Sequence, residues 1–136
     1  MRRSVALLCA PLLAAGLAAC GSTVSTSSFK GAEHEVAQTI SNLQADATAG
    51  EEKKICANDL AKAVVARLGG TTGCEATIKD QLDQVDSMEL NVQSVKVAPA
   101  GAAASAQVKG IYAGKTRLGT LSLVKEGGKW KVSSLG

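Results

Sequence analysis

Few side chains in this sequence could carry acid–base or metal chemistry. His34 is the one histidine, Tyr112 the one tyrosine, and Glu126 the one carboxylate after residue 90. A general acid–base reaction needs a positioned pair of such groups. Three aspartates recur at a spacing of three: Asp80, Asp83 and Asp86. That spacing on a helix is more typical of a solvated edge than of a metal site. The sequence has no EF-hand, phosphate-loop or nucleophile motif. It therefore predicts no catalytic residue, no metal site and no cofactor.

The N-terminal cysteine carries a clearer chemical signal. Two arginines open the chain, an apolar segment follows to residue 17, and small residues come next, which is the order of a secretory signal. A Gly, Ser and Thr stretch then ends the apolar segment, so it is shorter than the roughly 20 residues of a membrane-spanning helix. Cys20 comes directly after Leu17, Ala18 and Ala19. A leucine three positions before a cysteine resembles the lipobox of bacterial lipoproteins.

This resemblance implies a location for the protein. In such lipoproteins the cysteine thiol is alkylated by diacylglycerol, the preceding peptide bond is cut, and the cysteine becomes the new N-terminus. By this resemblance residues 1–19 are a signal peptide, and Cys20 binds membrane lipid and holds the protein at the cell membrane, facing the outside of the cytoplasm. Two acyl chains give stable attachment, whereas one chain alone is marginal. A plain secreted protein with an incidental cysteine is the alternative.

Cys56 and Cys74 form an even pair in a chain that carries an export signal. Disulfides persist outside the cytoplasm, so the pair predicts a bridge. Closing that loop would contribute about 3 kcal/mol on the chain-entropy model. A metal site or two reactive thiols are the alternatives, but His34 lies far from both cysteines and the sequence has no CxxC motif.

The length and charge of the chain limit the number of domains and the kinds of partner. Removing residues 1–19 from 136 leaves 117, enough for one domain with a modest core. The remaining chain has thirteen basic and twelve acidic residues, and a net charge near +1 does not indicate a nucleic-acid partner. From residue 91 onward there are seven Lys or Arg against one acidic residue. Lysine-solvated strands explain this basic half, and a surface for anionic headgroups or an acidic ligand is the alternative.

Hydrophobic periodicity predicts helices first and strands afterwards. Residues 20–29 form a flexible tether after the signal, because their composition buries too little apolar surface to order itself. Apolar residues recur at spacings of three and four over residues 32–47, 51–68 and 72–85, which predicts three helices. Thr72 and Glu75 have the spacing of a capping box for the third helix. In this arrangement a Cys56–Cys74 bridge joins the second helix to the third.

After residue 87 the period changes to two. Four strands are predicted, near residues 90–97, 104–112, 116–125 and 129–135, with bulges near Gln93 and at Gly119. Short turns between them permit only an antiparallel meander. Helices that cover one face of such a sheet give an α+β domain over residues 30–136.

The closing segment Glu126-Gly127-Gly128-Lys129-Trp130-Lys131-Val132, together with this order of elements, resembles the nuclear transport factor 2-like superfamily. The resemblance implies three N-terminal helices packed on a curved four-stranded antiparallel sheet, shaped as a cone with a cavity between them. Members of the superfamily include isomerases and dehydratases, and also modules that bind or dimerise without catalysis.

Three functions follow from the sequence and this resemblance. The first is a membrane-anchored, non-enzymatic module that binds a small molecule or a partner in the cell envelope. The second is a homodimeric structural or interaction module that uses the exposed sheet face. The third is a cavity enzyme of the isomerase type, for which the chain offers Tyr112 and little else.

Overall fold

The computed structural model describes residues 25–85, 88–112 and 114–135, with the backbone alone described at Tyr112 and Leu135. Cys20 and the predicted signal peptide lie outside these residues. The described elements are α1 (Gly31–Thr48), α2 (Glu52–Lys54), the π-helical segment η1 (Ile55–Asp59), α3 (Lys62–Arg67), α4 (Gly70–Asp83), β1 (Met88–Val97), β2 (Ala103–Tyr112), β3 (Lys115–Glu126) and β4 (Lys129–Leu135). Helices precede strands, as predicted, and the domain belongs to the α+β class.

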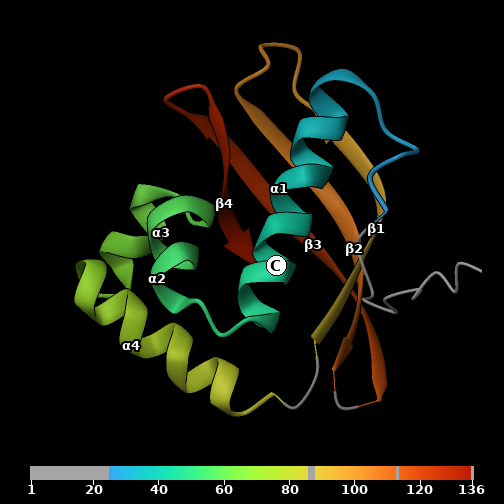
Figure 1. Cartoon of the computed structure of the whole chain (residues 1–136). Coiled ribbons are helices and arrows are strands. Elements are labelled where there is room, and N and C mark those ends of the chain that lie inside the picture. The colour runs from blue at the N-terminus through green and yellow to red at the C-terminus, as the bar shows by residue number, and fades with distance from the viewer. Residues whose placement is uncertain (1–24, 86–87, 113, 136) are drawn as a thin grey trace, which may run out of the picture.

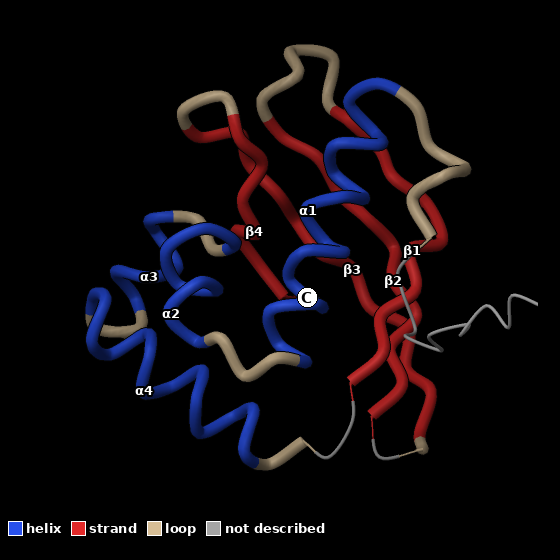
Figure 2. The backbone as a smooth tube through the Cα atoms, in the orientation of Figure 1, coloured by secondary structure: helices blue, strands red, loops and turns tan. Residues whose placement is uncertain are grey.

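The strands form one antiparallel sheet in the order β1-β2-β3-β4, which confirms the predicted meander. Figure 1 shows that the sheet is curved and that α1 lies across one of its faces. The shorter helical segments α2, η1 and α3 gather with α4 beside β4, as the tube in Figure 2 also shows. Helices therefore cover one face of the sheet.

Helix α1 carries its apolar stripe where the periodicity predicts it. Val36, Ile40 and Leu43 are buried against the sheet. Gln44 is buried beside them, and its Oε1 accepts a hydrogen bond from the backbone N–H of Leu90 at 2.7 Å. This bond satisfies a backbone donor of β1 and fixes that strand against the helix.

The second predicted helix is not continuous. Its π-helical segment ends at Asp59, Leu60 is extended with φ −95° and ψ 142°, and α3 begins only at Lys62. Leu60 forms a parallel bridge with Val132 of β4, and the N–H of Ala61 donates to the Val132 carbonyl at 2.8 Å. Pairing with β4 therefore replaces one turn of the expected helix.

The third predicted helix begins earlier than expected. Helix α4 starts at Gly70, and Gly69 before it adopts φ 95°, which lets α4 follow α3 almost directly. No side-chain cap is present at this N-terminus, so the predicted capping box is wrong. The two helices meet closely, because a Cβ added at Gly73 would lie 2.2 Å from the Leu68 carbonyl oxygen.

The sheet contains one of the two predicted bulges. Register shifts between Val92 and Ser94 leave Gln93 as the extra residue of β1, as predicted. The bulge expected at Gly119 is wrong, because β2 and β3 pair without interruption there. A second irregularity instead falls between Ser122 and Leu123, where β3 pairs with β4.

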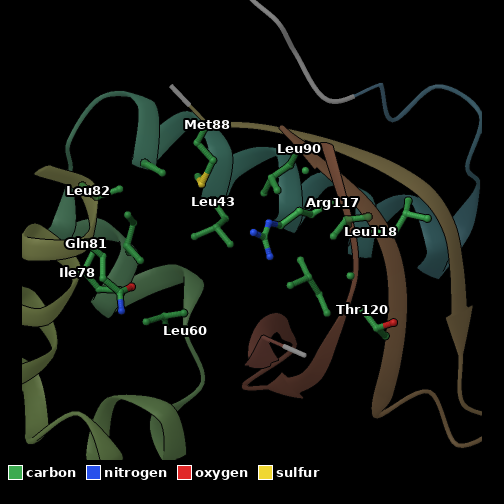
Figure 3. A pocket seen from close by; sticks show the side chains of 16 residues that line it. Leu43, Leu60, Ile78, Gln81, Leu82, Met88, Leu90, Arg117, Leu118 and Thr120 are labelled. Carbon is green, nitrogen blue, oxygen red and sulfur yellow. The ribbon is translucent and has the colours of Figure 1, made fainter. Parts of the chain in front are cut away.

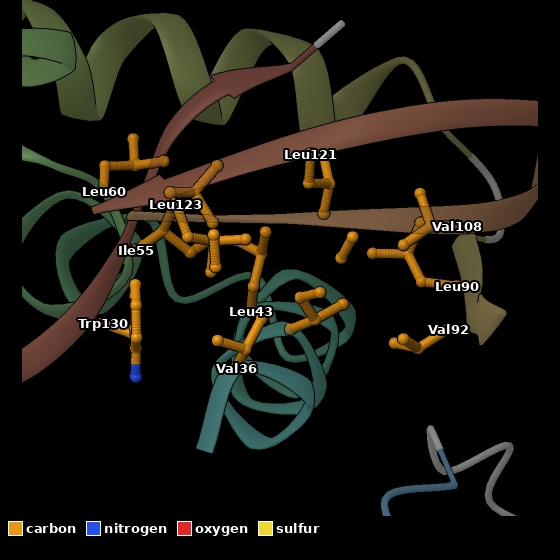
Figure 4. Packing of buried hydrophobic residues seen from close by; sticks show 14 of the residues in the cluster. Val36, Leu43, Ile55, Leu60, Leu90, Val92, Val108, Leu121, Leu123 and Trp130 are labelled. Carbon is orange, nitrogen blue, oxygen red and sulfur yellow. The ribbon is translucent and has the colours of Figure 1, made fainter. Parts of the chain in front are cut away.

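The core lies between α1, η1 and the inner face of the sheet (Figure 4). It is built mainly from aliphatic side chains, and Trp130 is its one buried aromatic ring among the described residues. Cys56 and Cys74 are both buried and form the predicted disulfide, with Cα atoms 6.1 Å apart. The bridge joins η1 to α4 and so holds the shorter helices to one another.

Candidate functional site

An apolar cavity of about 420 Å³ lies between α1, α4 and the inner face of the sheet. Its apolar lining combines buried core residues with Ala47, Ile78, Leu82 and Met88, which are only partly buried. Apolar side chains that remain accessible inside a concave site are typical of small-molecule binding sites. Figure 3 shows these side chains converging from the helices and from the strands.

The strand register places one charged residue of the cavity lining, Arg117, on the inner face of the sheet. Lys115 and Lys125 share its parity in β3 but lie outside that lining. Side chains alternate between the two faces of a strand. In β3 the buried residues Leu121 and Leu123 face the core, and Arg117 and Gly119 share their parity. Because β2 and β3 pair without a bulge over this stretch, Arg117 lies on the helix side of the sheet.

The residue opposite Arg117 leaves room for its side chain. Arg117 pairs with Gly110 of β2, which has no side chain to fill the inner face. In Figure 3 the guanidinium of Arg117 extends across the cavity toward Leu43 of α1. Arg117 is exposed, so the part of the cavity that it lines is open to solvent. We call this part of the cavity its mouth.

Polar groups are few among the described residues that line this cavity. Arg117 is the charged side chain, and Gln81 of α4 contributes an amide. Thr120 of β3 differs from Arg117 in parity, so its hydroxyl lies on the outer face of the sheet. Within the described part of the chain, no carboxylate forms an ion pair with Arg117. The site is therefore an apolar volume with one uncompensated positive charge at its mouth.

A separate polar groove of about 410 Å³ lies between the first half of α1, η1 and the β3–β4 hairpin. Trp130 lines this groove, and its Nε1 donates a hydrogen bond to Glu35 Oε2 at 3.3 Å. Lys125 lies 3.6 Å from the same carboxylate oxygen and 5.5 Å from the Trp130 ring centroid. Glu35 of α1 thus pairs with Lys125 of β3 beside this groove.

Asp59 is the buried acid of this groove, with 4% of its surface exposed. Its Oδ2 has no hydrogen-bond partner among the described residues. Burial raises the pKa of Asp59 to about 7, and the charge of Asp46 and a hydrogen bond with the Asp46 side chain add to this effect. The charge of Lys131 acts in the opposite direction. Lys131 donates to the neighbouring Asn58 carbonyl.

The candidates chosen from the sequence have structural roles where the structure describes them. His34 Nδ1 lies 3.0 Å from the Thr26 carbonyl oxygen, far from the apolar cavity. Glu126 Oε1 accepts from the backbone N–H of Lys62 at 3.1 Å, at the start of α3. Asp83 is exposed and pairs with Lys79 at 2.8 Å. The Tyr112 side chain and Asp86 lie outside the described residues.

Among the described residues, no His, Cys, Asp and Glu side chains gather in a group of three that could hold a metal ion. None of the helices found within residues 25–85 is long and apolar enough to cross a membrane.

Comparisons with known proteins show the fold. No protein-family profile matches the sequence, and no curated protein matches it. Among solved structures, the chain is similar to Rd1NTF2_05, a variant of a nuclear transport factor 2-like design, with a TM-score of 0.50 and 15% identity over 74% of this chain and 95% of that one. The fold is nuclear transport factor 2-like. A de novo designed protein with a curved β-sheet also matches, with a TM-score of 0.40 and 15% identity over 48% of this chain and 61% of that one.

In this nuclear transport factor 2-like fold, the apolar cavity occupies the space between helices and curved sheet that the resemblance predicts for a cone. Sequence reasoning did not single out Arg117 or Asp59. The signal for Arg117 was its parity with Leu121 and Leu123, which the expected bulge at Gly119 would have reversed. Asp59 gave no comparable signal, because an acid at that position of a continuous helix is expected to be solvated.

Proposed function

We propose that this protein is an exported lipoprotein, acylated at Cys20, that binds a small apolar molecule in the cone cavity without catalysing a reaction. The observation that carries the binding proposal is the cavity itself. Its volume of about 420 Å³ lies within the range of small-ligand sites, roughly 300–1,000 Å³. Ala47, Ile78, Leu82 and Met88 keep apolar surface available to a ligand there.

The chemistry of the described lining favours binding over catalysis. A cavity isomerase would require a positioned acid–base pair beside the substrate. The polar side chains that the described lining turns toward the cavity are a guanidinium and an amide, and a guanidinium does not release its proton at physiological pH. These groups orient a ligand rather than move its protons.

A neutral dye tests this proposal without involving charge. We expect 1-aminoanthracene to gain fluorescence with the full-length chain in lipid nanodiscs, beyond its signal with empty nanodiscs. Ala47→Phe, which adds a ring inside the cavity, should abolish the gain. Ala45→Phe adds the same ring to an exposed position of α1 and should leave it unchanged. Equal dye signals from the two variants, or none from the unmodified chain, would contradict binding in this cavity.

A further inference from the structure

We infer that the cavity selects a single-chain apolar molecule that ends in one carboxylate, and that Arg117 binds this carboxylate at the mouth. The inference rests on the proposed binding function and adds the chemical class of the ligand. Its basis is the placement of a lone cation in an otherwise apolar site.

Arg117 interrupts the apolar pattern of the inner sheet face. The other described residues of this face that line the cavity are apolar or glycine, including Leu90 of β1, Val108 of β2 and Leu121 of β3. A charged side chain among apolar lining residues departs from the folding pattern, and such departures are typical of functional positions. Because Arg117 is exposed and no described carboxylate pairs with it, its guanidinium is available to a ligand.

The charge at the mouth matches a monoanion. A guanidinium presents a planar fork that a carboxylate accepts with both oxygens. Arg117 is the one charged side chain of the described lining, so it neutralises one negative charge. A phosphomonoester carries about −1.5 to −2 at pH 7 and would remain partly uncompensated. Gln81, on α4, can donate a further hydrogen bond from the other side of the cavity.

The remainder of the cavity suits a flexible hydrocarbon chain. Ala47 and Leu82 present aliphatic surface from the two helices, and Met88 presents an unbranched thioether from β1. Methionine adapts to irregular apolar shapes, so a chain without a fixed outline can be accommodated. The hydrophobic part of the ligand supplies most of the affinity, and the carboxylate supplies orientation.

Displacement of 1-aminoanthracene from the full-length chain, in nanodiscs of phosphatidylcholine, tests the inference. The competitors are dodecanoate, dodecan-1-ol, dodecyl phosphate and dodecylammonium. We expect dodecanoate to bind most tightly, and Arg117→Gln to weaken it by about 10- to 100-fold, the range of a charge-assisted hydrogen bond. Dodecan-1-ol should bind the variant and the unmodified chain alike. Arg117→Lys should retain part of the preference for dodecanoate, because it keeps the charge and loses the fork.

Lys109→Gln is the matched control. It removes one charge from β2 at an exposed position directly opposite Leu118, whose parity differs from that of Arg117. Dodecanoate should bind it as it binds the unmodified chain. Partition of each competitor into the lipid is common to all variants, so differences between variants report the protein. Circular dichroism and the dye signal without competitor verify that each variant is folded.

Different results would overturn the carboxylate inference and the proposed binding function. Equal dodecanoate affinity for the unmodified chain and Arg117→Gln, or a preference for dodecyl phosphate, would overturn the carboxylate inference while the dye still reports the cavity. Absence of dye binding by the unmodified chain, or a dye signal that Ala47→Phe leaves unchanged, would instead overturn the proposed function. Loss of dodecanoate binding in Lys109→Gln to the same extent would assign the effect to overall charge and also overturn the role of Arg117.

Discussion

Replacing Asp59 with asparagine should change how the stability of the domain depends on pH. Asp59 has a pKa of about 7 in the folded protein, whereas an unfolded aspartate titrates near 3.9. Between these two values the folded state holds a proton that the unfolded state has released. The free energy of unfolding therefore falls as pH rises through this window, since the native state binds more protons than the unfolded state.

The magnitude follows from the two pKa values. The interval between about 3.9 and about 7, at 1.36 kcal/mol per pH unit, corresponds to a loss of about 4 kcal/mol by pH 8. Asparagine has nearly the same shape and cannot ionise, so Asp59→Asn should remove this loss. The amide also enters a buried position where Asp59 Oδ2 had no partner, which costs about 1–3 kcal/mol at every pH. The slope with pH, and not the stability at one pH, is the diagnostic quantity.

Urea unfolding between pH 4.5 and 8.5 measures that slope. Trp130 is the single tryptophan of the chain and is buried, so its fluorescence reports unfolding. Asp80→Asn, at an exposed position of α4, is the matched control and should keep the slope of the unmodified protein. Asp46→Asn should shift the fall in stability toward lower pH, because it removes a neighbouring charge that raises the pKa of Asp59. An unchanged slope in Asp59→Asn would refute this account.

Three further perturbations test the fold and the anchor. Cys56→Ser with Cys74→Ser should lower the free energy of unfolding by about 3 kcal/mol in oxidising buffer, and two titratable thiols in the unmodified native domain would contradict the bridge. Gly73→Ala should destabilise the domain although alanine favours helices by about 1 kcal/mol over glycine, because its Cβ would lie 2.2 Å from the Leu68 carbonyl oxygen; a raised melting temperature would contradict this packing. Cys20→Ala should release the protein from the membrane fraction on detergent partitioning, and unchanged partitioning would argue against acylation.

Local periodicity was sufficient for much of the fold. The stripe of Val36, Ile40 and Leu43 predicted α1, and the change to a period of two predicted the strands. The even pair of cysteines predicted the bridge between the helical segments. These signals depend on residues close in sequence, or on chemistry with few alternatives, and so they can be recognised without coordinates.

The features that sequence reasoning missed depend on distant partners. Cys56, Leu60, Val64 and Leu68 keep a spacing of four, yet the helix breaks because Leu60 and Ala61 pair with Val132 in β4. Nothing near Leu60 encodes that partner. The cavity likewise depends on register, since a single bulge at Gly119 would have turned Arg117 to the other face of the sheet.

The pairing of Leu60 and Ala61 with Val132 also covers part of the outer edge of the sheet. The outer strands of an open sheet expose unpaired backbone groups that can recruit strands from other molecules and begin aggregation. Leu60 and Ala61 occupy part of the outer side of β4, where Val132 would otherwise offer its carbonyl. At the opposite side, β1 carries the bulge at Gln93 and the exposed Lys96, both of which discourage such pairing. The interruption of the helix at Leu60 thus places Leu60 and Ala61 over part of the β4 edge, where they hinder pairing with a strand of another molecule.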